Sequence, residues 1–309
     1  MKLHTSQETK KIDALAIRET EHTGYSLMQT AAEFSLDVLM NEFDNTDEVI
    51  VFCAKGKNSG DGFLVANYAK EFGLSSTIVL CNPAKELKGV SKKAFQEAKN
   101  NGVKIVSVDS LPKLKISPKA VLVDALIGTG LKGELRNNIK KTILSINELG
   151  FRYPVVSLDI PSGVCSDSGV ANDPSVIADI TCTFVAQKRG CFTSEGRALS
   201  GHIFYSDLDI PKRIFPKVSC SSHIINMEDH IHKIILRDEN SHKGAFGHAF
   251  VVGGNKGFGG AAILAAKAAA FSGAGLIGLG TRPEHLEASL LSCPEVMTVG
   301  VDSGQDIEA

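Results

Sequence analysis

The chain has 309 residues, 43% of them hydrophobic, which fits one large or two ordinary globular domains. Its formal net charge of -2 and pI near 6.5 argue against nucleic acid or an anionic membrane as a partner. No apolar stretch is long enough to span a bilayer and the first residues lack a signal-peptide core, so we expect a soluble, cytoplasmic protein that binds a small molecule. The 7 cysteines include no C-x-x-C pair, and we expect reduced, mostly buried thiols.

Two helices are predicted at the start of the chain. Thr5 and Glu8 have the spacing of a capping box, and apolar residues recur behind them at helical intervals. The first helix therefore runs from about Ser6 to Glu19. A second follows Gly24 and carries the apolar positions Leu27, Met28, Ala31, Leu36 and Leu39.

Short runs rich in β-forming residues begin at Val49 and continue for about half of the chain. Helical segments separate the earlier runs, and strands that alternate with helices favour a mainly parallel sheet covered on both faces. We therefore predict an α/β fold, a Rossmann-like three-layer sandwich. The expected strands are 49–53, 77–80, 103–106, 120–123, 155–158, 180–185 and 202–205.

The pattern breaks after Pro211 into a polar and then a charged stretch, which is typical of a connection between domains. We expect a first domain over residues 1–215, a linker over 216–240 and a new segment over 241–309. This last segment indicates a single βαβ unit, which cannot cover its own apolar faces. It is therefore expected to be the incomplete start of a larger domain.

A glycine-rich turn, residues 54–62, joins the first strand to a helix. Glycines let the backbone approach a ligand, and the first N–H groups of the helix point outward, so the turn favours anion binding; an ordinary Gly/Asn turn is the alternative. The turn has neither the P-loop spacing nor the Gly-x-Gly-x-x-Gly fingerprint of dinucleotide-binding proteins. Simple hydride transfer therefore loses its main support.

Two aspartates follow buried apolar runs at predicted strand ends. The carboxyl ends of parallel strands meet at one edge of a sheet, so we expect Asp124 and Asp159 to face one crevice. Pro161 fixes the turn after Asp159, which makes this aspartate the leading catalytic candidate, although a helix cap or turn former is also compatible. Asn58, Asp124 and Ser162 together offer three hard oxygen ligands for a monovalent or divalent cation.

Two further segments are candidates for anion binding. The loop from Gly128 to Glu134 supplies backbone donors and Lys132, and matches Gly-x-Gly-x-x-Gly, but it does not follow the first strand, where that pattern has meaning. A solvated loop is an equal alternative. Lys188 or Arg189, at the end of another strand, either closes on an anionic ligand or marks a solvated strand end.

These motifs together resemble those of NAD(P)H-hydrate epimerase, from the first helix to about Pro211. Residues from about 242 to 294 resemble the start of the ADP- or ATP-dependent NAD(P)H-hydrate dehydratase, a ribokinase-like domain often fused behind the epimerase. The stretches that carry the first resemblance are 27–32, 55–62, 124–131, 158–163, 167–169, 178–181 and 188–190.

The resemblance implies repair of hydrated NADH and NADPH, in which an epimerase interconverts the R and S forms and a dehydratase restores the nicotinamide. It also implies a homodimer or higher homo-oligomer, a potassium ion held by Asn58, Asp124 and Ser162, and Asp159 at the ring. The dehydratase nucleotide site and its Gly-Asp motif lie beyond residue 309 in that family, so we expect no dehydratase activity, and no use of ADP or ATP, from this chain alone. The implied substrate-binding residues are Lys57, Asn58, Ser59, Gly60, Asp61, Gly128, Thr129, Gly130, Leu131, Lys132, Gly133, Glu134 and Asp159.

One departure from the family pattern bears on the site. Lys57 replaces the usual Asn and Ser59 a usual Gly, and a lysine there either grips a phosphate or weakens the neighbouring cation site by repulsion. A non-catalytic dimerising scaffold of the same fold is the alternative function. Retention of Asp124, Asp159 and Ser162 favours the enzyme.

Overall fold

The computed structural model describes residues 1–131, 133–231 and 239–307. These form two compact units, Met1–Asn226 and Met227–Ala309, each of which is described by itself. The first unit contains every residue that the sequence nominates for the epimerase site.

The first N-terminal helix begins where its capping residue predicts, and the second begins slightly earlier than expected, at Gly24 itself. Helix α1 (Ser6–Glu19) starts at a complete capping box, in which Glu8 N–H donates to Thr5 Oγ1 over 3.2 Å and Thr5 N–H donates to Glu8 Oε2 over 2.8 Å. Helix α2 (Gly24–Glu42) follows a second cap at Thr23. Both helices end within the first unit and pack their apolar faces into its core.

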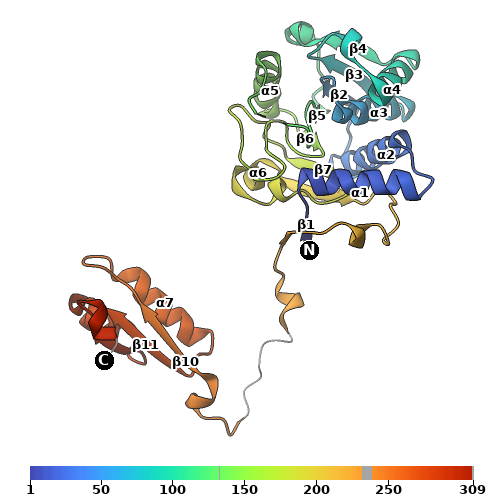
Figure 1. Cartoon of the computed structure of the whole chain (residues 1–309). Coiled ribbons are helices and arrows are strands. Elements are labelled where there is room, and N and C mark those ends of the chain that lie inside the picture. Colours follow the sequence, from blue (N-terminus) through green and yellow to red (C-terminus); the bar gives the residue numbers. More distant parts are fainter. Residues whose placement is uncertain (132, 232–238, 308–309) are drawn as a thin grey trace. The chain divides into compact units, whose positions relative to one another are not determined.

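A seven-stranded, fully parallel sheet forms the centre of the first unit, in the order β4-β3-β2-β5-β6-β7-β8 (Figure 1). The chain leaves β2 first toward β3 and β4 and then returns to add β5 on the other side. The predicted Rossmann-like α/β fold is confirmed, with a topological switch between β2 and β5. The strands are β2 (Glu48–Cys53), β3 (Ser75–Leu80), β4 (Lys104–Ser107), β5 (Ala120–Ala125), β6 (Val155–Leu158), β7 (Ile180–Phe184) and β8 (His202–Ser206).

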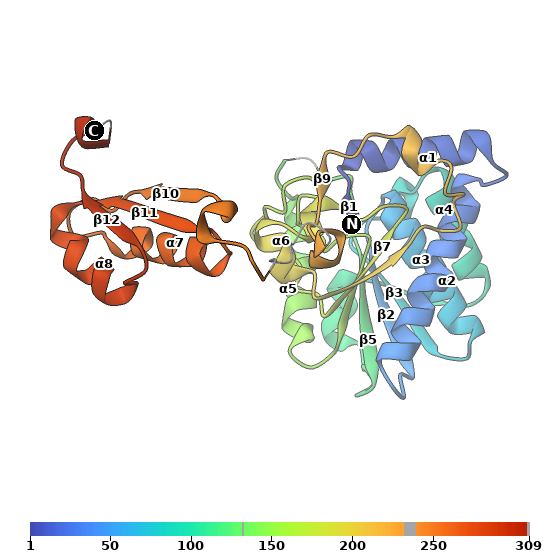
Figure 2. The same ribbon diagram turned by 90° about the horizontal axis from the view of Figure 1, so that it is seen from below.

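Helices cover both faces of this sheet, and the two faces have separate apolar cores. Alternate residues of β2 divide between them: Val49 and Val51 pack beneath α2, α3 (Lys57–Glu71) and α4 (Gly89–Asn100), whereas Ile50 and Phe52 pack beneath α5 (Asn137–Gly150). Figure 2 shows α5 on one side of the strands and α2 to α4 on the other. Helix α3 approaches the sheet closely at Gly62, where a Cβ would lie 2.4 Å from the Ala125 Cβ.

The ends of the first unit lie together. Strand β1 (Lys2–Leu3) pairs antiparallel with β9 (Ser222–His223), so residues up to Asn226, including part of the expected linker, belong to this unit. A short helix α6 (Ser194–Leu199) precedes β8. Short 3-10 helices complete the unit at 84–86, 108–113, 189–191 and 215–217.

The second unit is a three-stranded parallel sheet in the order β10-β11-β12. Half of the side chains on its outer strands are open to solvent, for example Phe250 at 50% and Met297 at 51% exposure. The predicted single βαβ unit is only its first part, because a second helix and a third strand follow it. The exposed side chains agree with the expectation that the segment does not cover its own faces. Its elements are β10 (His248–Val252), α7 (Gly260–Phe271), β11 (Leu276–Thr281), α8 (Leu286–Ser292) and β12 (Met297–Gly300), with 3-10 helices at 227–229, 243–246, 283–285 and 304–307.

The structure bears on two expectations drawn from composition, one about the cysteines and one about membrane-spanning segments. All of the cysteines are free and five of them are buried, as expected for reduced thiols. Over the part of the chain that the structure describes, no helix is both long and apolar enough to cross a bilayer.

Candidate functional site

A cavity of about 710 Å³ opens at the carboxyl ends of the central strands of the first unit. The glycine-rich turn after β2, the loop after β5 and the residues that follow β6 and β7 form its walls, and α1 and α2 close its rim. This is the edge where open α/β sheets bind ligands. The volume is within the usual range for a small-molecule site.

Asp159 follows β6 and lies in the wall of this cavity in a strained backbone conformation. Its φ is 69°, and Val185, after the neighbouring strand β7, has a φ of 66°. Left-handed conformations are costly for residues other than glycine, most of all for a β-branched one, and they cluster at functional sites. Asp159 Oδ2 accepts a hydrogen bond of 3.2 Å from the Thr129 N–H, so the loop after β5 also holds it.

A buried lysine holds the other carboxylate oxygen. Lys188 is 1% exposed, forms an ion pair with Asp159 Oδ1 and donates a hydrogen bond of 2.6 Å from Nζ to the Phe184 carbonyl. Lys188 therefore faces the cavity, and the alternative of a solvated strand end is wrong for it. Arg189 lies elsewhere, because its guanidinium donates to the Asp167 carbonyl and to Ser222 Oγ.

Asp61 is a second carboxyl in the cavity wall. Burial and the negative charge of Asp159 raise the pKa of Asp61 well above its usual value. The cavity thus combines an aspartate paired with a lysine and a second aspartate whose pKa is raised. Two carboxyls whose environments differ in this way are suited to acid/base chemistry.

Asp124, at the end of β5, is fully buried beneath the cavity and does not line it. Burial raises its pKa, while hydrogen bonds to its oxygens oppose this. The expectation that both aspartates face one crevice thus holds for Asp159 but not for Asp124. The carboxylate accepts from Leu126 N (3.2 Å), Ser157 Oγ (2.9 Å), Ser162 N (2.8 Å) and Ser162 Oγ (2.6 Å).

The expected cation ligands, Asn58, Asp124 and Ser162, are only partly arranged to bind a cation. Asn58 is 7% exposed, and neither its Oδ1 nor its Nδ2 has a hydrogen-bond partner among the groups that the structure places. A buried amide without partners is costly, so this one is suited to a ligand. Asp124 and Ser162 share their hydrogen bond of 2.6 Å, and a cation would need that hydroxyl to turn, for example toward the Ile127 carbonyl at 3.1 Å. The oxygen donor set fits a hard cation.

Clusters of the stronger metal ligands are absent from the same region. Among residues 1–131, 133–231 and 239–307, no group of three or more His, Cys, Asp or Glu side chains is arranged to hold a metal ion. A transition-metal centre of the kind that histidine and cysteine build therefore has no support in this part of the chain.

The loop after β5 reaches the site at Gly128. A Cβ there would lie 2.8 Å from Asp159 Oδ2 and 3.3 Å from Asn58 Cγ, so a larger residue would displace the Asp159 side chain. Thr129, Gly130, Leu131 and Glu134 also line the cavity, whereas Gly133 is exposed at its edge. Lys132 lies outside the described residues.

The glycine-rich turn after β2 divides between the cavity and the core. Lys57 lies at the rim with its side chain 81% exposed, and its Nζ is 3.8 Å from Asp13 Oδ2. Ser59 is buried, where its Oγ donates to the Ala125 carbonyl and accepts from the Ala54 N–H, each over 2.8 Å. Gly60 packs against Met28, whose Cε would lie 2.5 Å from an added Cβ. Ser59 and Gly60 thus shape the turn without lining the cavity.

Sequence reasoning missed several residues of the cavity wall. Thr9, Lys10 and Asp13 come from α1, and Leu208 follows β8. No motif marks these positions, since only the packing of α1 across the strand ends brings them to the cavity. The charge of Lys188 was visible in the sequence, but its burial and its pairing with Asp159 were not.

The strand order, the glycine-rich turn after β2 and a cavity at the carboxyl edge define the first unit as a Rossmann-like protein built to bind a small molecule. Residues 24–190 match the family described as YjeF-related protein N-terminus, and this match covers more than half of the chain. The chain belongs to that family. Residues 249–309 match the family described as NAD(P)H-hydrate dehydratase, so the two resemblances found in the sequence are confirmed, in the same order.

Curated relatives cover nearly the whole chain. A Coxiella burnetii protein named bifunctional NAD(P)H-hydrate repair enzyme Nnr is 34% identical over 306 residues, which are 99% of this chain and 62% of the relative. Its namesake in Escherichia coli K12 is 31% identical over 277 residues, 89% of this chain and 52% of the relative. A Leishmania major bifunctional NAD(P)H-hydrate repair enzyme is 32% identical over 291 residues, 91% and 51% respectively. The chain thus spans about half to three fifths of the length of these relatives.

A solved structure supports the fold of the first unit. The crystal structure of yeast YNL200c superposes with a TM-score of 0.61 at 22% sequence identity, over 70% of this chain and 93% of the yeast chain. At this level of identity the likeness concerns the fold alone.

Proposed function

We propose that the first unit is an NAD(P)H-hydrate epimerase, which interconverts the R and S forms of hydrated NADH and NADPH as part of nicotinamide cofactor repair. The observation that carries this proposal is the Asp159–Lys188 ion pair in the cavity wall beside Asp61. Membership of the YjeF-related family and relatives named as repair enzymes support it.

The chemistry of the substrate fits two carboxyls of different proton affinity. The hydrated ring carbon bears a hydroxyl beside a ring nitrogen, whose lone pair stabilises the cation left when that hydroxyl departs. Asp61 would give its proton to the departing hydroxyl, which leaves as water. A water molecule would then add to the opposite face of the ring and lose its proton to Asp159. Proton exchange with solvent would return both groups to their starting state.

Lys188 would hold the Asp159 side chain aimed at the ring. A buried carboxylate without a partner would be costly, and the ion pair together with the Thr129 N–H fixes both of its oxygens. This arrangement leaves the base in one orientation before substrate binds, which is the condition for efficient proton transfer.

A potassium ion is also part of the proposal. Asn58, Asp124 and Ser162 would hold it through oxygen atoms, and it would supply a positive charge beneath the bound substrate. ADP or ATP belongs only to the chemistry of a complete dehydratase domain and has no role in the epimerase reaction. A homodimer remains a prediction from the family resemblance.

The decisive experiment couples the purified chain to a separate dehydratase that accepts only the S form. The R form of NADH hydrate is supplied with this dehydratase in excess, and the return of NADH absorbance is followed. We expect the chain to accelerate the return, and Asp159→Asn to abolish the acceleration. Asp37→Asn, on the exposed face of α2, makes the same charge change away from the cavity and serves as the control.

A rate equal to the spontaneous epimerisation of R-hydrate would refute the proposal. An inactive chain that sedimented as a stable dimer would instead support the scaffold alternative.

A further inference from the structure

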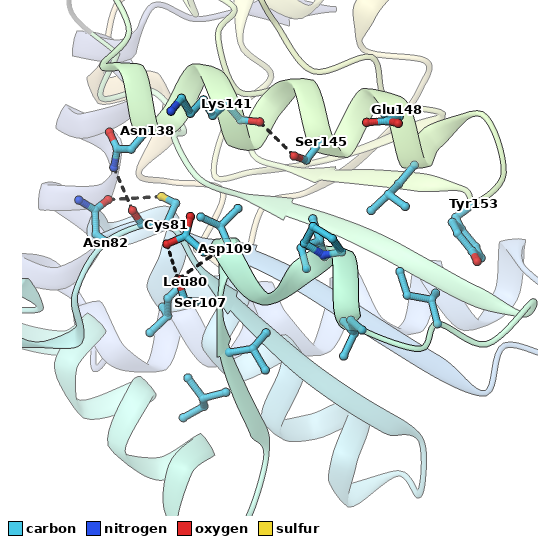
Figure 3. Close-up of a pocket in the computed structure, with 18 of the residues that line it drawn as sticks. Leu80, Cys81, Asn82, Ser107, Asp109, Asn138, Lys141, Ser145, Glu148 and Tyr153 are labelled. Carbon is cyan, nitrogen blue, oxygen red and sulfur yellow. Dashed lines mark hydrogen bonds between the residues drawn. The ribbon is translucent and has the colours of Figure 1, made fainter.

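A larger cavity in the first unit has no part in the proposed chemistry. It measures about 1420 Å³ and lies between the ends of β3 and β4, the 3-10 helix at 108–113 and the side of α5 (Figure 3). Apolar side chains such as Ile105, Leu111 and Leu149 line it together with polar ones. The polar residues include Asn82, Ser107, Asp109, Asn138, Lys141 and Glu148.

This cavity adjoins the reaction cavity at one residue. Asn82, which follows β3, lines both cavities. The first turns of α5 also serve both, because Ile139 lines the reaction cavity whereas Asn138 and Lys141 line the larger one. Asn138 Nδ2 donates to the Cys81 carbonyl over 2.9 Å, which fixes α5 against the end of β3 at the junction. Asn82 therefore marks the place where the linings of the two cavities meet.

The position of Asn82 in the fold has a known physical meaning. In a sheet with this strand order, a dinucleotide lies across the switch point with its pyrophosphate at the glycine-rich turn and its adenosine at the end of the next strand. The residue that meets the adenosine ribose follows that strand, about 20 residues beyond the turn, and in NAD-binding proteins it is acidic. Asn82 occupies this place after β3, and the larger cavity begins beside it.

We propose that the larger cavity binds the adenosine half of the hydrated dinucleotide, with the ribose at Asn82 and the nicotinamide half in the reaction cavity. This proposal rests on the proposed epimerase function, because it extends the same substrate. The pyrophosphate would lie between the two cavities at the turn formed by residues 54–58, where Lys57 is exposed. The role of Lys57 would then be phosphate contact at the rim.

The side chains at the junction are expected to favour a phosphorylated ribose. An acidic residue at this place binds the 2′-hydroxyl of NAD but repels the 2′-phosphate of NADP. Asn82 is neutral, and the Cys81 Sγ donates to its Oδ1 over 3.3 Å, so that its Nδ2 can donate to the ligand. Lys141 adds a positive charge from α5 on the wall near Asn138 (Figure 3). NADPH hydrate is therefore expected to be used at least as well as NADH hydrate.

Two substitutions test this assignment through substrate preference. Asn82→Asp places the repelling charge at the ribose, and the ratio of kcat/KM for NADPH hydrate to that for NADH hydrate should fall by about tenfold or more. Lys141→Glu should lower the same ratio. Lys140→Glu makes an identical charge change one residue away, outside the cavity lining, and should leave the ratio as in the unaltered protein. A Tm for each variant separates these effects from loss of folding.

A binding measurement keeps the test independent of catalysis. Adenosine 2′,5′-bisphosphate is titrated into the full chain by calorimetry, and Asn82→Asp should weaken its binding by about tenfold. If the chain has no epimerase activity but binds this probe through Asn82, the proposed function fails while the adenosine site stands. An unchanged substrate ratio in both variants, or absence of probe binding, would overturn the adenosine site. Concentration-dependent dimerisation that Lys141→Glu abolishes, without probe binding, would assign the cavity to a second copy of the chain.

Discussion

Asp124 and Asp159 are the acidic residues at the ends of neighbouring parallel strands, yet the first unit treats them in opposite ways. Asp124 is fully buried and accepts four hydrogen bonds. Asp159 lies in a cavity wall, in a left-handed conformation, and is held by one lysine and one backbone N–H. The comparison shows that a strand end can place a carboxylate either in the core or in a cavity wall, and that hydrogen-bond satisfaction and backbone strain distinguish the two.

The largest expected effect is that of Asp159→Asn on turnover. Loss of the base should lower kcat by about 10²- to 10⁴-fold, because that is the usual contribution of a positioned acid or base. Asparagine tolerates a left-handed conformation, so the fold should survive. The coupled NADH assay and a circular dichroism spectrum check both points. If turnover stayed within a few-fold of that of the unaltered protein, Asp159 would not be the base, and the proposed functional difference between the two aspartates would fail.

Lys188→Met removes the charge that balances Asp159 and replaces it with an apolar chain of similar length. Removing one partner of a buried ion pair costs about 3–5 kcal/mol of folding free energy. The cost here should be smaller, because the Asp159 side chain is 16% exposed to solvent. We expect a lower free energy of unfolding in urea together with a large loss of kcat. Adding Asp159→Asn should restore much of the stability and none of the activity. A double variant no more stable than Lys188→Met alone would contradict the pairing.

Asp124→Asn tests the structural side of the comparison. The amide keeps one acceptor oxygen, but its NH₂ group replaces the other oxygen and would face serine hydroxyls and N–H groups that also donate. A buried donor left without an acceptor costs about 1–3 kcal/mol. Unfolding in urea should show this loss. If potassium binds here, the variant should also lose any rate increase that potassium chloride gives over choline chloride. Full stability with normal turnover would remove Asp124 from both roles.

The sequence was sufficient for the architecture of the first unit and for the position of Asp159 at a strand end beside the cavity. Alternating strands and helices, with Pro161 after Asp159, place a carboxylate at the carboxyl edge of a parallel sheet, and the structure agrees. The burial of Asp124 was not predictable, because its serine donors come from the neighbouring strand and the loop that follows it. Nor was the position of Lys188, since its distance from Asp159 depends on the register of β6 and β7.

The effect of Asp61→Asn on stability, as distinct from its effect on turnover, is expected to be smaller and to depend on pH. The pKa of Asp61 is raised in the folded state, so the folded protein binds this proton more tightly than the unfolded chain does. Its burial therefore costs stability increasingly as pH rises from the ordinary carboxyl range through the folded pKa. Asp61→Asn should raise Tm more at pH 8 than at pH 5, by roughly 2–4 °C. An equal change at both pH values would contradict the raised pKa.

The smallest change is expected from Lys57→Asn, which restores the residue usual in the epimerase family. The Lys57 side chain is 81% exposed, and solvent screens its charge, so potassium affinity should improve by no more than about threefold. If the exposed ammonium contacts the pyrophosphate instead, KM for the hydrate should rise by a similar factor. Potassium titration of the initial rate distinguishes these results.

The pairing of β1 with β9 has a consequence for the order in which the site is assembled during synthesis. The Met1 ammonium donates to the Ile224 carbonyl, 223 residues away, and His4 exchanges backbone hydrogen bonds with Gln187 and Arg189 on either side of Lys188. The segment that braces this lysine is thus translated well before the residues with which it pairs. Contacts of such long sequence separation form slowly. The wall of the cavity at Lys188 can therefore be completed only after strands β2 to β7 have been synthesised.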